Sequence, residues 1–460
     1  MSAATPQAVP GGKDNIEDLY ALSPVQQGML FHALLTPGAS PYLEQGVWTL
    51  GGAVDLARFE RAWNVLIDRH PILRTVFYEA RKQPIQIVLK RLPVPFSVCD
   101  LCALPPDRQR TACAAFLDDD LRKPIDLRAG PLMRATLLRL SGDETRFVLT
   151  FDHSILDGWS LGPLCTDLQA VYDALTLGVE PAAVDAPPYK DFVVWLSRRD
   201  RREALDFWAR YLSGFKAPTP LPADRQAEGR RSLASRLHTI AESTYLALGG
   251  RAREHRVTVG ALVQAAWAVL LARYGGVEEV VFGLTVSGRP PELPGCERMI
   301  GPFINTLPVR ARLDGEAAFL DLPPALMQHY ADLGRHGYLS LPDIQSGSEI
   351  TPPRKLFDSI LIFHNEAIRK SFSSPHLQLI AVDESVERTS YDLTLDVLPG
   401  QPVQVSLAYV REIFDAATIE RLAQGFERLL ESVVASPQAR IGELEILPAA
   451  EREQVLVEFN

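Results

Sequence analysis

Apolar and polar residues follow two different periods along the chain, and together these periods predict a mixture of strands and helices. Residues 146–151 form an apolar run rich in β-branched and aromatic side chains, which is typical of a buried strand. Residues 159–175 show the spacing of a helix. The loop between them, 153–158, reads His-Ser-Ile-Leu-Asp-Gly. Such a strand-to-helix loop can hold an imidazole rigidly at the edge of a cavity.

Two amphipathic helices are predicted near opposite ends of the chain. Each follows an aspartate suited to cap it and an apolar, strand-like stretch. These segments are residues 46–51, Asp55 and 56–67 at one end, and 403–410, Asp415 and 419–433 at the other. The repetition suggests two equivalent halves, although no repeat is visible residue by residue.

The middle of the chain predicts a buried helix and two further strands. The helix begins after Thr258, is apolar nearly all round and ends at Tyr274, before a pair of glycines. Strands are predicted at 279–286 and 303–312. Because strands and helices alternate irregularly, the chain is assigned to the mixed α/β class.

The length of 460 residues exceeds what a single ordinary core supports, so two domains are expected. A stretch rich in Pro and Ala at 181–188 predicts the linker between them. We therefore expect a flexible leader over 1–15, an N-terminal lobe over 16–180 and a C-terminal lobe over 189–447.

Composition excludes several classes of function. A net charge of −10 argues against nucleic-acid binding, and no apolar run is long enough to span a membrane. The chain starts without a signal-peptide pattern, and its five cysteines fit a reducing compartment, so a cytoplasmic protein is expected. Cys99 and Cys102 form a C-x-x-C pair, but the sequence has no second such pair to complete a metal site, so none is predicted.

His153 is the leading candidate for chemistry, because a neutral imidazole handles protons near pH 7. The sequence has no phosphate-binding glycine loop, no serine-nucleophile elbow and no dinucleotide fingerprint. Direct transfer between two bound substrates is favoured instead. The simpler interpretation is a core histidine beside a turn, with Asp157 acting only as a helix cap.

Several stretches together resemble the condensation domain of nonribosomal peptide synthetases, which serve secondary-metabolite and antibiotic biosynthesis. They occur in the family's order over almost the whole chain. The matching stretches are residues 22–32, 69–77, 126–132, 153–160, 283–289, 300–308 and 446–460. The resemblance implies two lobes like chloramphenicol acetyltransferase, each an α+β sandwich, in a V-shaped pseudodimer with a central tunnel.

The implied reaction is amide-bond formation, in which a carrier-bound acceptor amine attacks a carrier-bound donor thioester. His153 would orient the amine or take its proton, and Gly158 would offer its N–H to the developing oxyanion. The resemblance pairs Asp157 with Arg289 as a structural brace. Phosphopantetheine arms would arrive with the carrier proteins, and the domain itself would bind no cofactor.

Asp152 differs from the residue that is usual at this position in the family. The family's motif is written HHxxxDG, with histidine where this chain has Asp152. Adjacent side chains on a strand point to opposite faces, so Asp152 need not touch substrate. A natural variant or an engineered substitution would each give this sequence, and a catalytically impaired domain is one interpretation of it.

Further candidates are weaker. Tunnel or substrate contacts are predicted for Trp159, Ser160, Asn305 and Tyr391, and a carrier-docking patch is predicted for Arg198, Arg199, Arg201 and Arg202. The simpler alternatives are core positions for the first group and a solvated helix face for the second.

The functional alternatives are a starter-type domain or acyltransferase that uses an acyl-CoA donor, and a scaffold that has lost its chemistry through Asp152. The motifs look most like the subtype that joins two L-configured residues, and epimerisation is disfavoured. Residues 448–460 resemble the start of a linker to an adenylation domain, so the expected partners are donor and acceptor carrier proteins and a downstream adenylation domain. The domain is expected to be a monomer.

Overall fold

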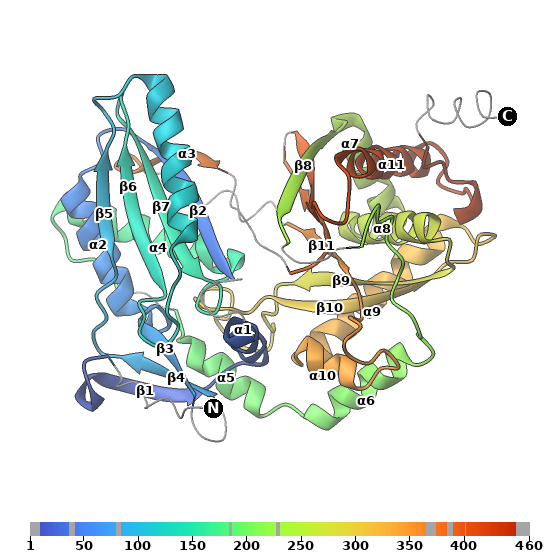
Figure 1. Cartoon of the computed structure of the whole chain (residues 1–460), viewed down its shortest axis with the longest axis horizontal. Helices are drawn as coiled ribbons and strands as arrows, with labels where there is room; N and C mark the ends of the chain where they lie inside the picture. The colour runs from blue at the N-terminus through green and yellow to red at the C-terminus, as the bar shows by residue number, and fades with distance from the viewer. Residues whose placement is uncertain are drawn as a thin grey trace. The chain divides into compact units, whose positions relative to one another are not determined.

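The computed structural model describes residues 10–35, 42–79, 84–183, 186–226, 231–364, 374–383, 390–400 and 402–447. Their contacts divide the chain into two compact units (Figure 1). Unit 1 takes its described residues from Met1–Arg199, Arg289–Ile304 and Ala367–Thr389, and unit 2 takes its own from Asp200–Gly288, Asn305–Glu366 and Ser390–Asn460.

Unit 1 holds two sheets and five helices among its described residues. One sheet has the strand order β12-β2-β7-β6-β5 and the other has the order β1-β4-β3. The elements are β1 (Ile16–Ala21), α1 (Pro24–Leu35), β2 (Leu43–Gly51), α2 (Leu56–Arg69), β3 (Thr75–Glu79), β4 (Pro84–Leu89), β5 (Phe96–Asp100), α3 (Pro106–Arg122), β6 (Met133–Arg139), β7 (Glu144–Asp152), α4 (Gly158–Leu177), α5 (Tyr189–Ser197) and β12 (Gln378–Asp383).

The larger sheet of unit 1 is covered on both faces, which is why β7 is buried at every position from Phe147 to Asp152. Phe147 packs toward α2, where its ring lies 5.0 Å from that of Phe59. Val148 points the opposite way and packs with Cys113 of α3. A strand buried on both sides is expected to be a continuous apolar run, as the sequence of residues 146–151 is.

Unit 2 contains one six-stranded sheet, in the order β10-β9-β11-β13-β14-β8, and its helices. The elements are α6 (Arg201–Leu212), β8 (Leu233–Ile240), α7 (Glu242–Glu254), α8 (Val259–Gly275), β9 (Glu279–Val286), β10 (Asn305–Arg312), α9 (Leu322–His336), α10 (Leu341–Ser346), β11 (Ser359–Phe363), β13 (Leu393–Leu398), β14 (Val403–Val410) and α11 (Ala416–Ala435). Helix α8 is buried over most of its circumference, as its uniformly apolar sequence predicts.

Most predicted elements are confirmed within a few residues, including α4, α8 and β9. The predicted cap at Asp55 is confirmed, since its carboxylate accepts the N–H of Arg58 at 2.9 Å. The predicted cap at Asp415 is wrong in its chemistry. Asp415 does precede α11, but its side chain makes no capping hydrogen bond and pairs with Arg225 instead.

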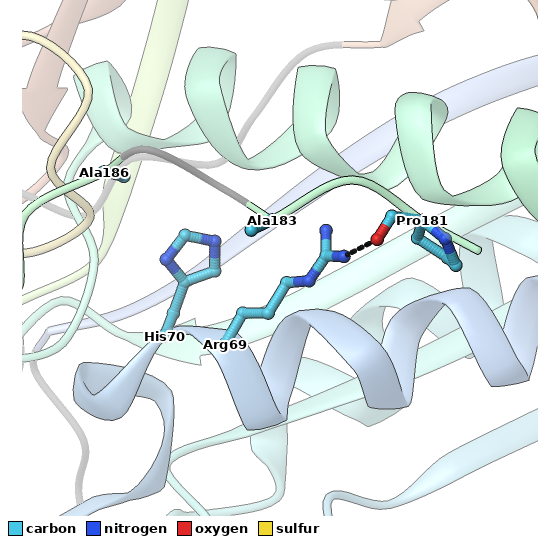
Figure 2. A pocket seen from close by; sticks show the side chains of 5 residues that line it. All are labelled: Arg69, His70, Pro181, Ala183 and Ala186. Carbon is cyan, nitrogen blue, oxygen red and sulfur yellow. Dashed lines mark hydrogen bonds between the residues drawn. The ribbon is translucent and has the colours of Figure 1, made fainter.

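The two units divide the chain differently from the lobes expected from sequence. The described residues of the expected linker, 181–188, belong to unit 1. One reason is that the Arg69 guanidinium donates to the carbonyl oxygen of Pro181 at 3.0 Å, beside a cavity of about 360 Å³ (Figure 2). Two segments placed by sequence in the C-terminal lobe also belong to unit 1, because β12 pairs with β2 and Arg289–Ile304 binds the β7–α4 loop.

The expected leader lies outside the described residues up to residue 9, and so does all of the expected linker to an adenylation domain, 448–460. Within the described chain, no single helix is long and apolar enough to cross a membrane. The bent pair α7 and α8 together has the length and composition of a membrane-spanning segment, and those two properties alone.

Candidate active site

His153 lies directly after β7, in a short loop fixed by main-chain hydrogen bonds on both sides. Its N–H donates to the carbonyl oxygen of Tyr42 at 2.8 Å, and the N–H of Asp152 donates to that of Leu132 at 2.9 Å. The side chain of His153 is 16% exposed. The imidazole is therefore held by a rigid backbone and still reaches the surface of its unit.

Glu44, in β2, places a carboxylate oxygen 3.2 Å from Nε2 of His153. In the antiparallel register Glu44 lies opposite Phe151, so their side chains point to the same face of the sheet. His153 follows Phe151 by two positions and points to that face as well. Sequence reasoning missed this residue because the predicted strand began at residue 46. A charged residue just ahead of an apolar strand is the only signal it carried.

Asp157 is the centre of a buried hydrogen-bond network, and its side chain has no exposed surface. Its Oδ1 accepts the N–H of Ser160 at 2.8 Å, which caps α4. Its Oδ2 accepts the N–H groups of Phe303 at 2.8 Å and Ile304 at 3.1 Å. A single carboxylate thus joins the β7–α4 loop to a segment about 145 residues later in the chain.

Arg289 lies beside this carboxylate, as the family resemblance implied. Its Nη2 is 3.5 Å from Oδ1 of Asp157, and its Nη1 donates to the carbonyl oxygen of Met299 at 2.9 Å. The guanidinium also covers the ring of Phe303 at 4.1 Å from the centroid. Asp157 and Arg289 are therefore committed to bracing the loop and are not available to substrate.

Ser160, for which a tunnel or substrate contact is predicted from sequence, makes structural contacts. It is buried, and its hydroxyl lies 2.7 Å from Oδ1 of Asp157, 2.8 Å from the carbonyl oxygen of Gly301 and 3.1 Å from Nη2 of Arg289. Because every one of these partners belongs to the brace, Ser160 is part of it. Trp159 is half-buried, and nothing in the structure tests its predicted contact with substrate.

Gly158 is the first residue of α4, and a side chain there would meet open space. Among the described residues, no heavy atom outside its chain neighbours and its own helix backbone lies within 4 Å of where its Cβ would be placed. Helix N-termini present unpaired N–H groups that suit a developing negative charge. The position therefore fits the predicted oxyanion donor, and the absence of a side chain leaves that end of the helix open.

Asp152 is almost fully buried, and its Oδ1 accepts the N–H of Ser154 at 3.0 Å. Burial raises the pKa of this carboxyl above its usual value, which outweighs the hydrogen bond to Ser154. The residue is thus a buried group with a local structural bond, as the strand alternation predicted.

Asp152→Asn is expected to raise the free energy of unfolding at pH 7. The folded chain keeps the Asp152 proton to a higher pH than the unfolded chain, so stability is lost as pH rises from the ordinary Asp pKa through the raised one. Denaturant unfolding at a series of pH values should therefore show the gap between variant and wild type narrowing as pH falls toward 4.

Asp126→Asn is the matched control, because Asp126 makes the same local bond, to the N–H of Arg128 at 2.9 Å, but is exposed. It should show no such gap. A gap for Asp152→Asn that stays constant or widens at low pH would contradict the buried, raised-pKa description.

Two of the remaining predicted residues, Asn305 and Tyr391, belong to unit 2. Asn305 belongs to unit 2, where its amide donates to the carbonyl oxygens of Gly337 and Leu339 at 2.8 and 2.9 Å. Tyr391 also belongs to unit 2, and its ring stacks on that of Phe357 at 5.6 Å. Both have structural contacts, and their predicted contacts with substrate stay predictions.

The predicted docking arginines are divided between the units. Arg198 and Arg199 belong to unit 1, and Arg199 lies 3.8 Å over the ring of Trp195. Arg201 and Arg202 belong to unit 2, where Arg201 makes a two-pronged ion pair with Asp343 at 2.6 and 3.0 Å. Arg201 is thus already engaged within the protein.

Comparison with known proteins identifies the family of the chain. The condensation domain family model matches residues 16–456. One of the proteins that make up the linear gramicidin synthase of Brevibacillus parabrevis is 37% identical over 452 residues, which are 97% of this chain but only 9% of that protein. The chain therefore spans less than a tenth of the length of this curated relative.

Solved condensation domains share the fold. The starter condensation domain of rhizomide synthetase matches with a TM-score of 0.81 at 21% identity, covering 93% of this chain and 98% of that one. The first condensation domain of the calcium-dependent antibiotic synthetase matches with a TM-score of 0.80 at 18% identity, covering 94% and 100%. The predicted mixed α/β fold of the chloramphenicol acetyltransferase type is confirmed. The chain belongs to the condensation domain family of nonribosomal peptide synthetases, acyltransferase-type domains that form amide bonds between thioester-bound substrates.

Proposed function

We propose that this chain joins a donor and an acceptor, each carried as a thioester on the phosphopantetheine arm of a carrier protein. The acceptor amine attacks the donor carbonyl, the C–N bond forms, and the C–S bond breaks to release the donor carrier's thiol. The observation that supports this best is that two polar residues of the β7–α4 loop differ in their contacts. Asp157 is wholly occupied in bracing the loop, whereas the His153 imidazole remains partly exposed.

His153 handles the proton of the attacking amine. It either orients the amine by a hydrogen bond or accepts its proton as the tetrahedral species forms, and a positioned imidazole suits both roles. The N–H at Gly158 is proposed to stabilise the negative charge on the former carbonyl oxygen. Both substrates are bound, so the protein contributes mainly position and proton handling.

The proposed setting follows the relatives, which are components of larger synthetases. Donor and acceptor carrier proteins and a downstream adenylation domain are the proposed partners, and the proposed location is the cytoplasm. We propose a monomer that joins two L-configured residues and holds no cofactor of its own. Arg198, Arg199 and Arg202 are proposed to contribute to carrier docking, since all three carry positive charge at exposed positions.

The proposed reaction is tested by intact-protein mass spectrometry with a donor-loaded and an acceptor-loaded carrier protein. The expected product is the donor group transferred to the acceptor carrier. A parallel reaction replaces the donor carrier with an acyl-CoA, because one similar solved domain is a starter domain in complex with C8-CoA. Product only from acyl-CoA would support the starter-type alternative and contradict the carrier donor.

The impaired-variant alternative is tested in the same assay with Asp152→His. Because Asp152 is buried and bonded to Ser154, we expect its replacement to change the rate by less than about tenfold. Product that forms only after the substitution would show that the wild-type chain is a disabled domain.

Gly158→Ala is expected to separate activity from folding. The added methyl group meets no neighbouring atom, and alanine favours a helix over glycine by up to about 1 kcal/mol, so stability should stay the same or rise slightly. Condensation should slow by about tenfold or more, since the methyl group intrudes where the reacting carbonyl must approach. Thermal unfolding and the transfer assay measure the two effects, and full activity would exclude a reacting centre at this helix end.

A further inference from the structure

The Nε2 side of the His153 imidazole contacts a carboxylate. The Nδ1 atom is buried, and the side chain as a whole is 16% exposed. Oε1 of Glu44 lies 3.2 Å from Nε2, and the Glu44 side chain is itself only 12% exposed. The carboxylate therefore lies directly against one ring nitrogen of His153.

The position of Glu44 is set by the sheet and not by a flexible surface side chain. β2 and β7 are paired from Gly51 opposite Glu144 to Leu43 opposite Asp152, without a break in register. The N–H of His153 extends this pairing to Tyr42. A carboxylate at 12% exposure loses much of its hydration, and burying it without a compensating partner is costly. The contact with an imidazole supplies such a partner.

We propose that Glu44 is a positioning residue for the reaction of His153: its carboxylate holds the Nε2 edge of the imidazole in place and favours the proton-bearing form of the ring. This inference rests on the proposed function. Glu44 acts through His153, by fixing the orientation of the ring through the contact at Nε2. Its negative charge stabilises the imidazolium relative to the neutral ring.

Two other ionisable groups lie close to the ring. Asp152 precedes His153 and points to the opposite face of the sheet, the face on which Thr150 hydrogen-bonds to Asp120 of α3. Burial raises the pKa of Tyr42 to about 12, so this phenol stays neutral across the working range. The Asp152 carboxyl is electrostatically coupled to His153 from that opposite face, and Glu44 is the group whose carboxylate lies at Nε2.

The direct test is an NMR titration of the nine histidines in the substrate-free chain, with His153→Ala used to assign the signal. In Glu44→Gln the titration midpoint of His153 is expected to fall by about one pH unit, because the anion that favours the imidazolium is gone. Glu427→Gln is the matched control. Glu427 pairs with His238 of unit 2 at 2.7 Å and has similar burial, so its replacement should leave the His153 midpoint unchanged. An unchanged His153 midpoint in Glu44→Gln would overturn the proposal.

The kinetic test uses the transfer assay over the same pH range. Glu44→Gln should lower the plateau rate by about tenfold through looser positioning, with KM little changed, and should move the acid limb of the profile to lower pH. Glu44→Asp keeps the charge and should recover part of both effects. If Glu44→Gln fails to fold, Glu44→Ala takes its place in the titration, because it also removes the charge, and an unchanged His153 midpoint in that variant overturns the proposal.

These readouts separate this inference from the proposed function. A shifted midpoint in a chain that forms no amide would leave the Glu44–His153 coupling standing and contradict amide formation. An active chain in which Glu44→Gln changes neither the His153 midpoint nor the pH profile would support amide formation and contradict the Glu44–His153 coupling.

Discussion

His153→Ala is expected to slow amide formation by about 100- to 10,000-fold, which is the usual contribution of a positioned general acid or base. The fold should survive the change, because the main-chain bond from His153 to Tyr42 remains and the side chain is partly exposed. We expect the free energy of unfolding to fall by about 1–3 kcal/mol, because the buried Glu44 carboxylate loses its imidazole partner. The rate of product formation on the acceptor carrier and a urea unfolding curve measure the two quantities.

His238→Ala is the matched control for this prediction. It removes another histidine paired with a glutamate, at 2.7 Å, from unit 2. It should leave the condensation rate within about a factor of two of the wild type. Equal losses in both variants would mean that the effect of His153→Ala reports damage to the fold and not a role in the reaction.

Asp157→Ala is expected to lower the free energy of unfolding by about 3–5 kcal/mol, because it breaks a buried ion pair by removing one partner. Arg289 would keep its charge at 7% exposure, and the N–H groups of Phe303 and Ile304 would lose their acceptor. Urea unfolding followed by tryptophan fluorescence measures the loss.

Asp55→Ala provides the comparison, since Asp55 is also a helix-capping aspartate but is exposed and accepts one N–H, from Arg58. Its loss should cost only about 1 kcal/mol. If both variants lost the same free energy of unfolding, Asp157 would be no more than an ordinary helix cap. Its role in bracing the β7–α4 loop would then be wrong.

The local elements of this fold follow from its sequence, but the grouping of segments does not. The apolar run before His153 and the glycine pair after Tyr274 mark β7 and the end of α8 because periodicity and turn chemistry are local properties. The membership of Arg289–Ile304 in unit 1 depends on the bonds from Asp157 to Phe303 and Ile304. No local pattern reports a hydrogen bond between residues about 145 positions apart.

The same distinction applies to the site. His153, Asp157 and Arg289 were predictable because they stand in motifs that resemble a known family. Glu44 was not, since its place beside His153 follows from the register of β2 on β7, which becomes visible only in three dimensions. The partners of Ser160 were not predictable for a related reason. Its hydroxyl contacts Gly301, about 140 residues later in the chain, and no local pattern reports such a contact.

The most direct test of the account is a single-turnover transfer experiment with donor- and acceptor-loaded carrier proteins, followed by intact-protein mass spectrometry. Wild type and His153→Ala are compared at equal concentrations after unfolding curves have shown that both are folded. The account predicts donor transfer to the acceptor carrier by the wild type and a rate lower by about 100-fold or more for His153→Ala. Equal rates in the two folded proteins would contradict the central claim that His153 carries the reaction.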